Sequence, residues 1–337
     1  MLTERRATVL GLVVHEYIST AVPVSSKALV DRYDLGVSPA TIRNELARLE
    51  EDGYITHPHT SAGRVPSDQG YRVYVEALMA EEAIDAEERR TIEHQFYQAS
   101  GGLDEWLSLG AAVLASAVGN VAVITRPRRT VAHLKNVQLV HLHDASALVV
   151  AVMDDGRVQQ RLVTFTRPTT QAELTALAEA LNVRHSTADA QTIRASLEDE
   201  GEPDRARIEL ALAELVDEHE RSDDTYLDGV SDVLGQPEFQ SPDRMLEAVQ
   251  HLEAYELRRA LPTTREVSAG HLRIVIGREN RSPWMSEWSA IVASYGSGGA
   301  SGMLAVVGPT RMQYARTVPR VRYFAELMSE VLHAVGA

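Results

Sequence analysis

The sequence contains no cysteine, which excludes disulfide bonds, thiolate metal ligands and thiol nucleophiles. It also lacks an apolar run long enough to span a bilayer, because serine, glycine and asparagine interrupt its most apolar stretch, residues 109–124. The first residues lead directly into an amphipathic pattern, without the separate apolar block of a signal peptide. These absences predict a cytoplasmic protein with no membrane association.

Excess positive charge is missing too. The chain has 33 Lys and Arg residues against 48 Asp and Glu residues, for a net charge of −15. The deficit is uneven, because residues 1–80 contain 8 basic and 10 acidic residues and are nearly neutral. At 337 residues and 44% hydrophobic content, the chain is expected to form two or three globular domains. An acidic body would suppress indiscriminate phosphate binding and leave any nucleic-acid recognition to the first domain.

Helical signals follow one another closely at the start of the chain. Apolar residues at helical spacing predict a first helix over residues 3–20, and Ser25 caps a short second helix that reaches residue 33. Gly36 lies in the turn that follows. Ser38 then caps a third helix, with Pro39 at its first position, and Gly53 ends it. This succession predicts a helix-turn-helix.

Two short extended pieces come next, at residues 54–56 and 64–66, and the loop between them is rich in turn-forming residues. They predict a β-hairpin, which would serve as the wing of a winged helix-turn-helix. A fourth helix is expected to begin at Ser67. The acidic run from Glu81 to Glu88 is expected to continue that helix as a solvated linker.

The third predicted helix has the chemistry of a helix that enters the major groove of DNA. A rotation of 100° per residue places Ile42, Leu46 and Leu49 on the core face, opposite Arg43, Asn44 and Arg48. Arginine can bond a guanine edge twice and asparagine can do the same with adenine. The alternative is that these side chains only solvate a surface helix, but the preceding helix and turn favour base contact.

Residues around this helix complete the predicted interface. The start of the second helix suits a DNA phosphate, and an arginine in the wing suits a narrow minor groove. The wing histidines, including His57, have no additional ligand spaced to hold a metal, so a polar wing is favoured. The candidate DNA-binding residues are Ser25, Ser26, Lys27, Ser38, Thr41, Arg43, Asn44, Arg48, His59, Thr60, Ser61 and Arg64.

The remaining sequence alternates between strand and helix character. Strands are expected over 121–124, 137–142, 147–153 and 158–163, helices over 171–260, and strands again over 272–276, 289–295 and 302–307. A long amphipathic helix ends the chain. This order predicts an α+β protein in which a helical insertion interrupts one α/β domain.

Several motifs resemble the HrcA family of heat-inducible transcription repressors. They are the stretches 38–50, 53–55 and 59–74, followed by Pro237-Glu238-Phe239, Ile276-Gly277-Arg278-Glu279-Asn280 and Gly308-Pro309-Thr310-Arg311-Met312-Gln313-Tyr314. The match is loose over residues 183–236. The resemblance implies a homodimer that binds an inverted-repeat DNA operator, CIRCE, and represses chaperonin and other heat-shock operons until heat stress, with the chaperonin as modulator.

The resemblance also implies the domain plan. A winged helix-turn-helix is expected over 1–80, a GAF-like α/β domain over 81–170 and 236–337, and an inserted helical dimerisation region over 171–235.

Two other functional classes are alternatives to repression. The chain has neither a Gly-x-Ser-x-Gly motif nor a phosphate-binding loop with its lysine, and the glycine-rich stretch 296–302 is expected to be a turn between strands. His141 and His143 alternate on one strand but form no metal-ligand set. No enzyme activity, cofactor or metal is therefore expected. The alternative is a ligand-responsive regulator with a small molecule in the GAF-like domain.

For that alternative, Glu279, Asn280 and Arg311 could line a pocket, although structural hydrogen bonds and salt bridges are the favoured role of these residues.

Overall fold

A computed structural model describes residues 2–58, 63–97, 102–129, 132–143, 145–197, 202–221, 224–263, 266–267, 270–297 and 299–335. The chain divides into two compact units. The first comprises residues 1–126, 225–298 and 302–337, and the second comprises residues 127–224 and 299–301.

The first unit begins with three helices and a two-stranded antiparallel hairpin, in the order expected from the sequence. These elements are α1 (Glu4–Thr20), α2 (Ser26–Arg32), α3 (Pro39–Glu51), β1 (Ile55–Thr56) and β2 (Val65–Pro66). Helix α4 (Asp68–Val73) follows and continues as one π-helical turn, η1 (Tyr74–Leu78). Apolar residues of all three leading helices, such as Leu10, Leu29 and Leu46, are fully buried in a common core.

A sheet forms the centre of the rest of this unit. Its strands lie in the order β8 (Thr225–Asp228), β3 (Val121–Thr125), β11 (Ala300–Pro309), β10 (Trp288–Ser297) and β9 (Leu272–Ile276). Both faces are covered, and successive residues point to opposite faces. Ala122 and Ile124 belong to one core, whereas Val121 and Val123 belong to the other. Near-continuous apolar strands are the sequence pattern that such a doubly covered sheet requires.

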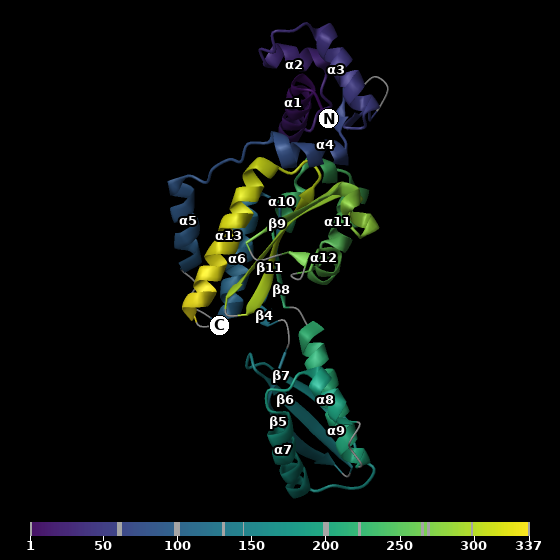
Figure 1. The fold of residues 1–337 in the computed structure, drawn as a ribbon, viewed down its shortest axis with the longest axis vertical. Helices are drawn as coiled ribbons and strands as arrows, with labels where there is room; N and C mark the ends of the chain where they lie inside the picture. Colours follow the sequence, from purple (N-terminus) through teal and green to yellow (C-terminus); the bar gives the residue numbers. More distant parts are fainter. Residues whose placement is uncertain are drawn as a thin grey trace. The chain divides into compact units, whose positions relative to one another are not determined.

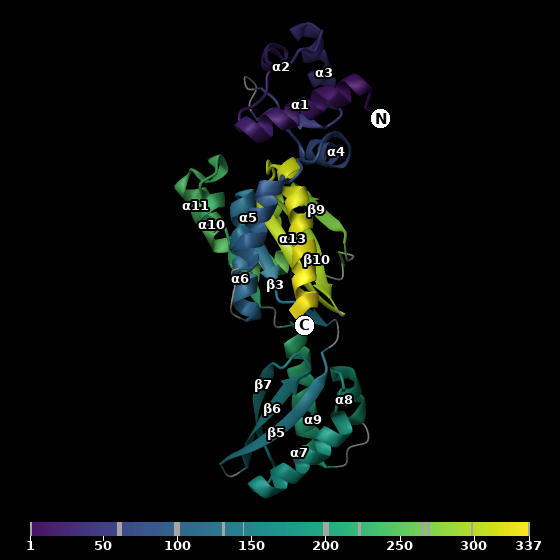
Figure 2. The ribbon, with the colours of Figure 1, turned by 90° about the vertical axis from the view of Figure 1, so that its left-hand side faces the viewer.

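Helices on the two faces differ in length (Figures 1 and 2). One face carries α5 (Ala86–Tyr97), α6 (Leu103–Val118) and α13 (Tyr314–Val335); the other carries α10 (Val230–Leu234), α11 (Pro242–His251) and α12 (Ala254–Ala260). Short 3-10 turns complete this part: η3 (Pro237–Phe239), η5 (Gly277–Glu279) and η6 (Pro283–Glu287).

The acidic segment after η1 corrects one expectation. Residues 79–85 are not helical, and a new helix begins only at Ala86. The Glu82 backbone N–H donates to the Ala315 carbonyl at 2.8 Å, and the Glu81 side chain accepts two hydrogen bonds from Arg322. The prediction of a solvated helical linker was therefore wrong, because these contacts with α13 hold the segment in a non-helical conformation.

The second unit is a three-stranded antiparallel sheet with helices on one face. The elements are β5 (Leu134–His143), β6 (Ser146–Met153), β7 (Val158–Thr164), α7 (Gln171–His185), α8 (Ala190–Ser196) and α9 (Pro203–Arg221). The two-residue strand β4 (Arg128–Arg129) pairs with the first residues of β11. The expected domain boundary at residue 171 falls between β7 and α7. Strands and helices share one core here, so this compact unit extends across that boundary.

The opposite face of this small sheet is apolar and open. Val140, Leu148 and Leu162 face one another across the three strands. Val140 is 41% exposed and Leu162 is 56% exposed, and Leu142 and Val158 are also exposed. An apolar sheet face of this kind is typical of a surface that another protein covers.

Among the helices of the described ranges, none combines the length and the apolar character that crossing a bilayer demands.

Candidate nucleic-acid interface

Helix α3 forms because local sequence signals specify both of its ends. The Ser38 side chain accepts a hydrogen bond from the Thr41 N–H at 3.2 Å, and Pro39 occupies the first turn, where no N–H is needed. The Ser38 and Thr41 hydroxyls are also 3.1 Å apart and hydrogen-bonded. After the helix, Gly53 adopts a φ of +82°, which glycine accepts without strain. These signals fix the register and therefore decide which side chains face outward.

The outward face of α3 carries the predicted base-reading residues. Ile42, Leu46 and Leu49 are buried, as the periodicity predicted, whereas Arg43, Asn44 and Arg48 are exposed. Within the described ranges, these three side chains have no hydrogen-bond or ion-pair partner inside the protein. Their donors and acceptors are therefore available to an external ligand.

Helix α2 presents fewer side chains than the sequence suggested. The Ser25 hydroxyl caps the helix by accepting the Ala28 N–H at 3.1 Å, and Lys27 is exposed. Ser26, by contrast, is only 8% exposed. Any phosphate contact by Ser26 would therefore have to use its backbone N–H, while Ser25 and Lys27 can use their side chains.

Charged residues that sequence reasoning did not select hold α2 and α3 against α1. Arg6 of α1 donates to Glu45 at 3.3 Å and to Asp52 at 3.4 Å. Glu16 of α1 is nearly buried and pairs with Arg32 of α2. The Tyr33 hydroxyl also donates to Glu16 at 3.2 Å. Partial burial and this hydrogen bond raise the pKa of Tyr33. The partners are 16 to 46 residues apart, so no local pattern reveals them.

The wing begins where the hairpin was expected. Ile55 pairs with Pro66 and Thr56 with Val65, and the Arg64 backbone exchanges two hydrogen bonds of 2.8 Å with Val24. The predicted contacts His59, Thr60 and Ser61 lie outside the described residues.

The Arg64 side chain lies at the foot of the hairpin. It is 15% exposed and donates to Glu50 at 3.3 Å, and His57 also contacts Glu50. Contact of this guanidinium with DNA would therefore compete with its ion pair to Glu50.

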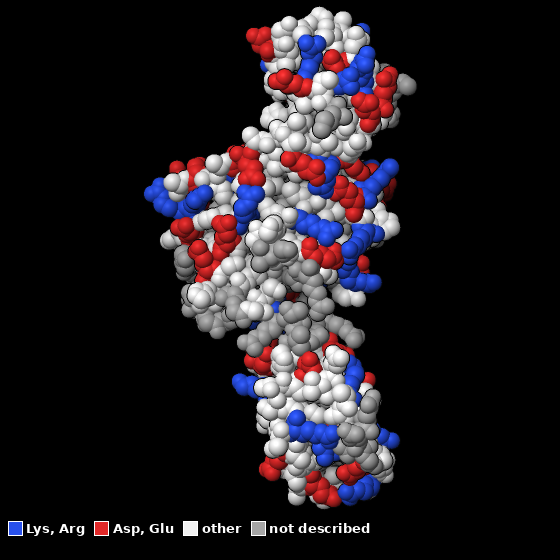
Figure 3. Space-filling model, viewed as in Figure 1, with Lys and Arg blue, Asp and Glu red and all other residues white. Residues whose placement is uncertain are grey.

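The basic residues of segment 1–80 fall into two groups, those that form an ion pair and those that do not. Arg6, Arg32, Arg64 and Arg72 each pair with a carboxylate. In the described ranges, the other four basic residues form no ion pair: Arg5, Lys27, Arg43 and Arg48. The part of the first unit that contains the β8–β3–β11–β10–β9 sheet is called the sheet domain below. Over it, the face in Figure 3 shows basic and acidic side chains interspersed. Carboxylates, including Glu279 from outside residues 1–80, thus neutralise these four arginines, and within the described ranges the two arginines of α3 stay unpaired.

A junction attaches the reading head, residues 1–78, to the sheet domain. Arg311 donates to the Ile18 carbonyl at the end of α1 at 3.1 Å, and it forms a two-bond ion pair with Glu238 of η3. Arg72 of α4 pairs with Glu279 and donates to the Ile274 carbonyl at 2.8 Å. The predicted structural role of Arg311 and Glu279 agrees with these contacts.

Aromatic residues complete the junction. The rings of Tyr71 and Tyr314 lie 6.0 Å apart. The Tyr314 hydroxyl donates to the Thr310 carbonyl at 2.7 Å and accepts a hydrogen bond of 2.7 Å from the Ser289 hydroxyl. Full burial raises the pKa of Tyr314 above its ordinary value. This hydroxyl therefore stays protonated and acts as a hydrogen-bond donor.

Comparisons with known proteins agree with the family resemblance that the motifs at this junction indicate. A family model described as the HrcA protein C terminal domain matches residues 104–318. The heat-inducible transcription repressor HrcA of Roseiflexus castenholzii is 41% identical over 98% of this chain and 94% of its own length. This chain belongs to the HrcA family. The HrcA repressor of Chloroflexus aggregans is 38% identical, over 98% of this chain and 93% of its own.

A solved structure shares the HrcA fold of this chain. It is titled as the crystal structure of a hypothetical protein at 2.2 Å resolution, and it matches 99% of each chain with a TM-score of 0.60 and 22% identity. At that identity the likeness concerns the fold alone.

Proposed function

We propose that this HrcA protein represses heat-shock operons by binding an inverted-repeat CIRCE operator as a homodimer. Residues 1–80 would act as a winged helix-turn-helix, with α3 as the recognition helix. The single observation that carries the proposal is the exposed stripe of Arg43, Asn44 and Arg48, which has no partner within the described chain. Each half of the operator would receive one α3 helix, because the symmetry of a dimer mirrors that of its operator.

Two side chains of this stripe can each form two hydrogen bonds with the edge of one base, which would allow α3 to distinguish between bases. The Arg43 guanidinium suits the O6 and N7 atoms of guanine, and the Asn44 carboxamide suits the N6 and N7 atoms of adenine. The small side chain of Ala40 lets the start of the helix approach the base edges. Thr41 and the Ser38 hydroxyl flank this entry. Arg48, one turn further along, would contact the opposite border of the groove.

Phosphate contacts would position the helix without reading sequence. Ser25 and Lys27 on α2 are the candidates at one border of α3. Arg64, His59, Thr60 and Ser61 are the candidates in the wing. Arg64 would exchange its Glu50 partner for the DNA backbone or the minor groove, so its contribution to affinity should be smaller than that of an unpaired arginine.

Dimerisation is proposed to use the open face of the β5–β6–β7 sheet. The row Val140–Leu148–Leu162 is apolar, and a second copy would present the same row, as a two-fold interface requires. Among the described residues of its own unit, this sheet packs against helices on one face, through α7 and α9. A second copy would remove the exposed valines and leucines from water, at about 25 cal/mol per Å² of apolar surface buried.

Heat would reduce operator occupancy through the packing of the reading head or through the dimer. A domain of this size is stable by only about 5–15 kcal/mol, so moderate heating shifts its equilibrium strongly. In this proposal the chaperonin modulates the amount of active repressor.

Fluorescence anisotropy on a labelled inverted-repeat duplex tests the proposal. Arg43→Ala and Asn44→Ala should each weaken operator binding by about 1–3 kcal/mol and leave binding to random DNA nearly unchanged. Arg5→Ala is the matched control, because it removes an exposed, unpaired positive charge outside α3. Equal losses on operator and random DNA would reject base reading by α3.

A further inference from the structure

An open pocket lies on the face of the large sheet that α10, α11 and α12 cover. Its volume is about 230 Å³. The lining residues are Phe239, Arg244, Glu247, Ala248, His251, Pro283, Trp284, Ser286, Glu287 and Trp288. Because drug-sized ligands occupy roughly 300–1,000 Å³, this pocket suits a single head group with a short alkyl chain.

Aromatic rings form one side of the pocket. His251 of α11 stacks on Trp284 of η6, with centroids 4.7 Å apart and planes 6° from parallel. Trp288 meets Trp284 edge-on at 6.2 Å, and Phe239 packs on Trp288 at 4.9 Å. Indole rings attract cations through the negative charge of their π faces, and tryptophan does so most strongly among the aromatic residues.

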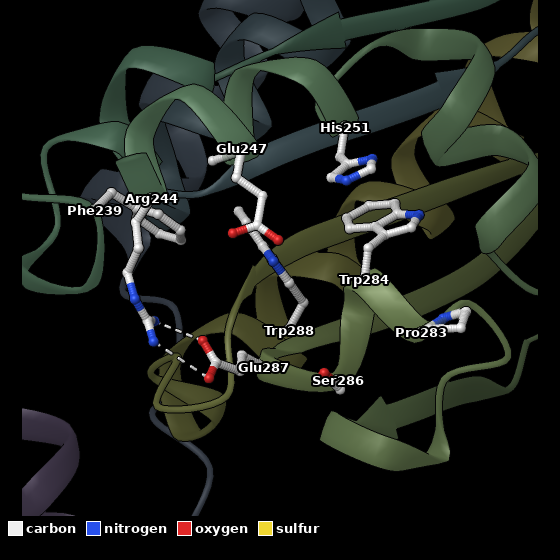
Figure 4. Close-up of a pocket in the computed structure, with 10 residues that line it drawn as sticks. Phe239, Arg244, Glu247, His251, Pro283, Trp284, Ser286, Glu287 and Trp288 are labelled. Atoms are coloured by element: carbon white, nitrogen blue, oxygen red, sulfur yellow. Dashed lines mark hydrogen bonds and ion pairs between the residues drawn. The ribbon is translucent and has the colours of Figure 1, made fainter. Parts of the chain in front are cut away.

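Carboxylates supply the negative charge. Glu287 is engaged by Arg244, whose guanidinium donates at 2.6 Å and 3.5 Å. Glu247 projects into the space between this ion pair and the His251–Trp284 stack (Figure 4). Among the residues that the structure describes, Glu247 has no hydrogen-bond or ion-pair partner. With histidine neutral, the lining carries two carboxylates and one guanidinium, and one negative charge is uncompensated.

We propose that this pocket binds an organic cation, an alkylguanidinium or alkylammonium group, between the Glu247 carboxylate and the indole of Trp284. The carboxylate pairs with the cation, and the aromatic wall contacts its apolar stem. The same chemistry is offered by a free amine and by an arginine or lysine side chain of a peptide.

Both walls of the pocket connect to the junction that holds the reading head. Phe239 is adjacent to Glu238, which pairs with Arg311, and Arg311 binds the Ile18 carbonyl. On the other wall, the Glu287 carbonyl accepts the Thr310 N–H at 3.1 Å. A cation that tightens either wall therefore acts on a residue adjacent to the Arg311–Glu238 ion pair. This link, unlike the binding itself, rests on the proposed DNA-binding function.

Isothermal titration calorimetry of the full-length protein with butylguanidinium tests the site. One cation per chain should bind, and neutral butylurea should not. Glu247→Gln should weaken binding at least fivefold, because it removes the charge and keeps the shape. Glu253→Gln is the control, since it removes an exposed carboxylate outside the pocket. Far-UV circular dichroism verifies that both variants are folded.

The outcomes separate the alternatives. Equal affinity of Glu247→Gln and the unchanged protein, or equal heats for butylguanidinium and butylurea, would overturn the site. Tighter binding of a blocked Gly-Arg-Gly peptide than of butylguanidinium identifies a protein side chain as the natural cation, and weaker binding identifies a free amine. These titrations contain no DNA, so their result is independent of operator recognition.

Operator affinity measured with saturating butylguanidinium tests the link to the reading head. A change of at least twofold is expected, and it should disappear in Arg311→Ala. An unchanged affinity would overturn the link.

Discussion

The contact of Arg311 with α1 gives a prediction about how firmly the reading head is held. Arg311 is 13% exposed, and its partner Glu238 is 25% exposed. Arg311→Ala removes two hydrogen bonds to this carboxylate and a third to the Ile18 carbonyl. It also leaves Glu238 without its cation in a partly buried position.

The loss of stability in Arg311→Ala can be estimated from the burial of the Arg311–Glu238 ion pair. Exposed ion pairs contribute about 0–1 kcal/mol, whereas breaking a fully buried pair costs about 3–5 kcal/mol. Loss of this partly buried pair should therefore cost about 2 kcal/mol of stability, which corresponds to a roughly 30-fold change in the equilibrium constant for opening. Because Arg311 lies outside the reading head, the loss should appear as easier opening of residues 1–78.

Hydrogen exchange monitored by mass spectrometry measures this opening. Peptides from α1 should exchange roughly 30-fold faster in Arg311→Ala, since their protection depends on the free energy of local unfolding. Arg281→Ala is the control: Arg281 is 72% exposed, its ion pair with Glu266 lies at the surface, and exchange in α1 should not change. A less than twofold effect of Arg311→Ala would show that the junction does not stabilise the head.

Three further results are expected. Leu162→Arg should place a charge in the open face of the small sheet and convert the proposed dimer to monomers in analytical ultracentrifugation; an unchanged sedimentation coefficient would exclude this face from the interface. Gly70→Ala should destabilise the reading head by about 1–3 kcal/mol in urea unfolding, because a Cβ atom would lie 2.1 Å from the Tyr54 carbonyl oxygen; full retention of stability would contradict this packing. The hydrogen bonds from Arg322 lower the pKa of Glu81, so the contact of residues 79–85 with α13 should persist at neutral pH and be lost as the pH falls through that lowered pKa. Protease cleavage within 79–85 should therefore increase in acid, and a cleavage rate independent of pH would contradict the assignment.

Local signals allowed much of the fold to be predicted. The cap at Ser38, the spacing of Ile42 and Leu46 and the glycine at 53 specify α3 without reference to the rest of the chain. Strands were predicted from apolar runs, and the observed β3, β5, β6, β7, β9, β10 and β11 include each expected stretch. Segment 79–85 was predicted wrongly, because its conformation depends on contacts with α13, far along the chain.

The candidate DNA interface was predictable only in part. Exposure of Arg43 and Asn44 follows from helical periodicity, since the residues that bury the opposite face lie within the same helix. Burial of Ser26 and the pairing of Arg64 with Glu50 do not follow, because each depends on a neighbouring element. The aromatic pocket was not anticipated, although Trp284 and Trp288 lie close together in the sequence; its other wall comes from residues 239–251.

The sequence by itself determined where α3 begins and ends and which of its residues face outward, because capping and periodicity act within a few residues. Tertiary structure alone decided which charges remain available. The arginines at positions 6, 32, 64 and 311 are engaged by carboxylates 14 to 73 residues away, and such pairs form only when the chain is folded. The same folding joins Arg311 to Ile18, 293 residues apart, and so connects the reading head to the sheet domain.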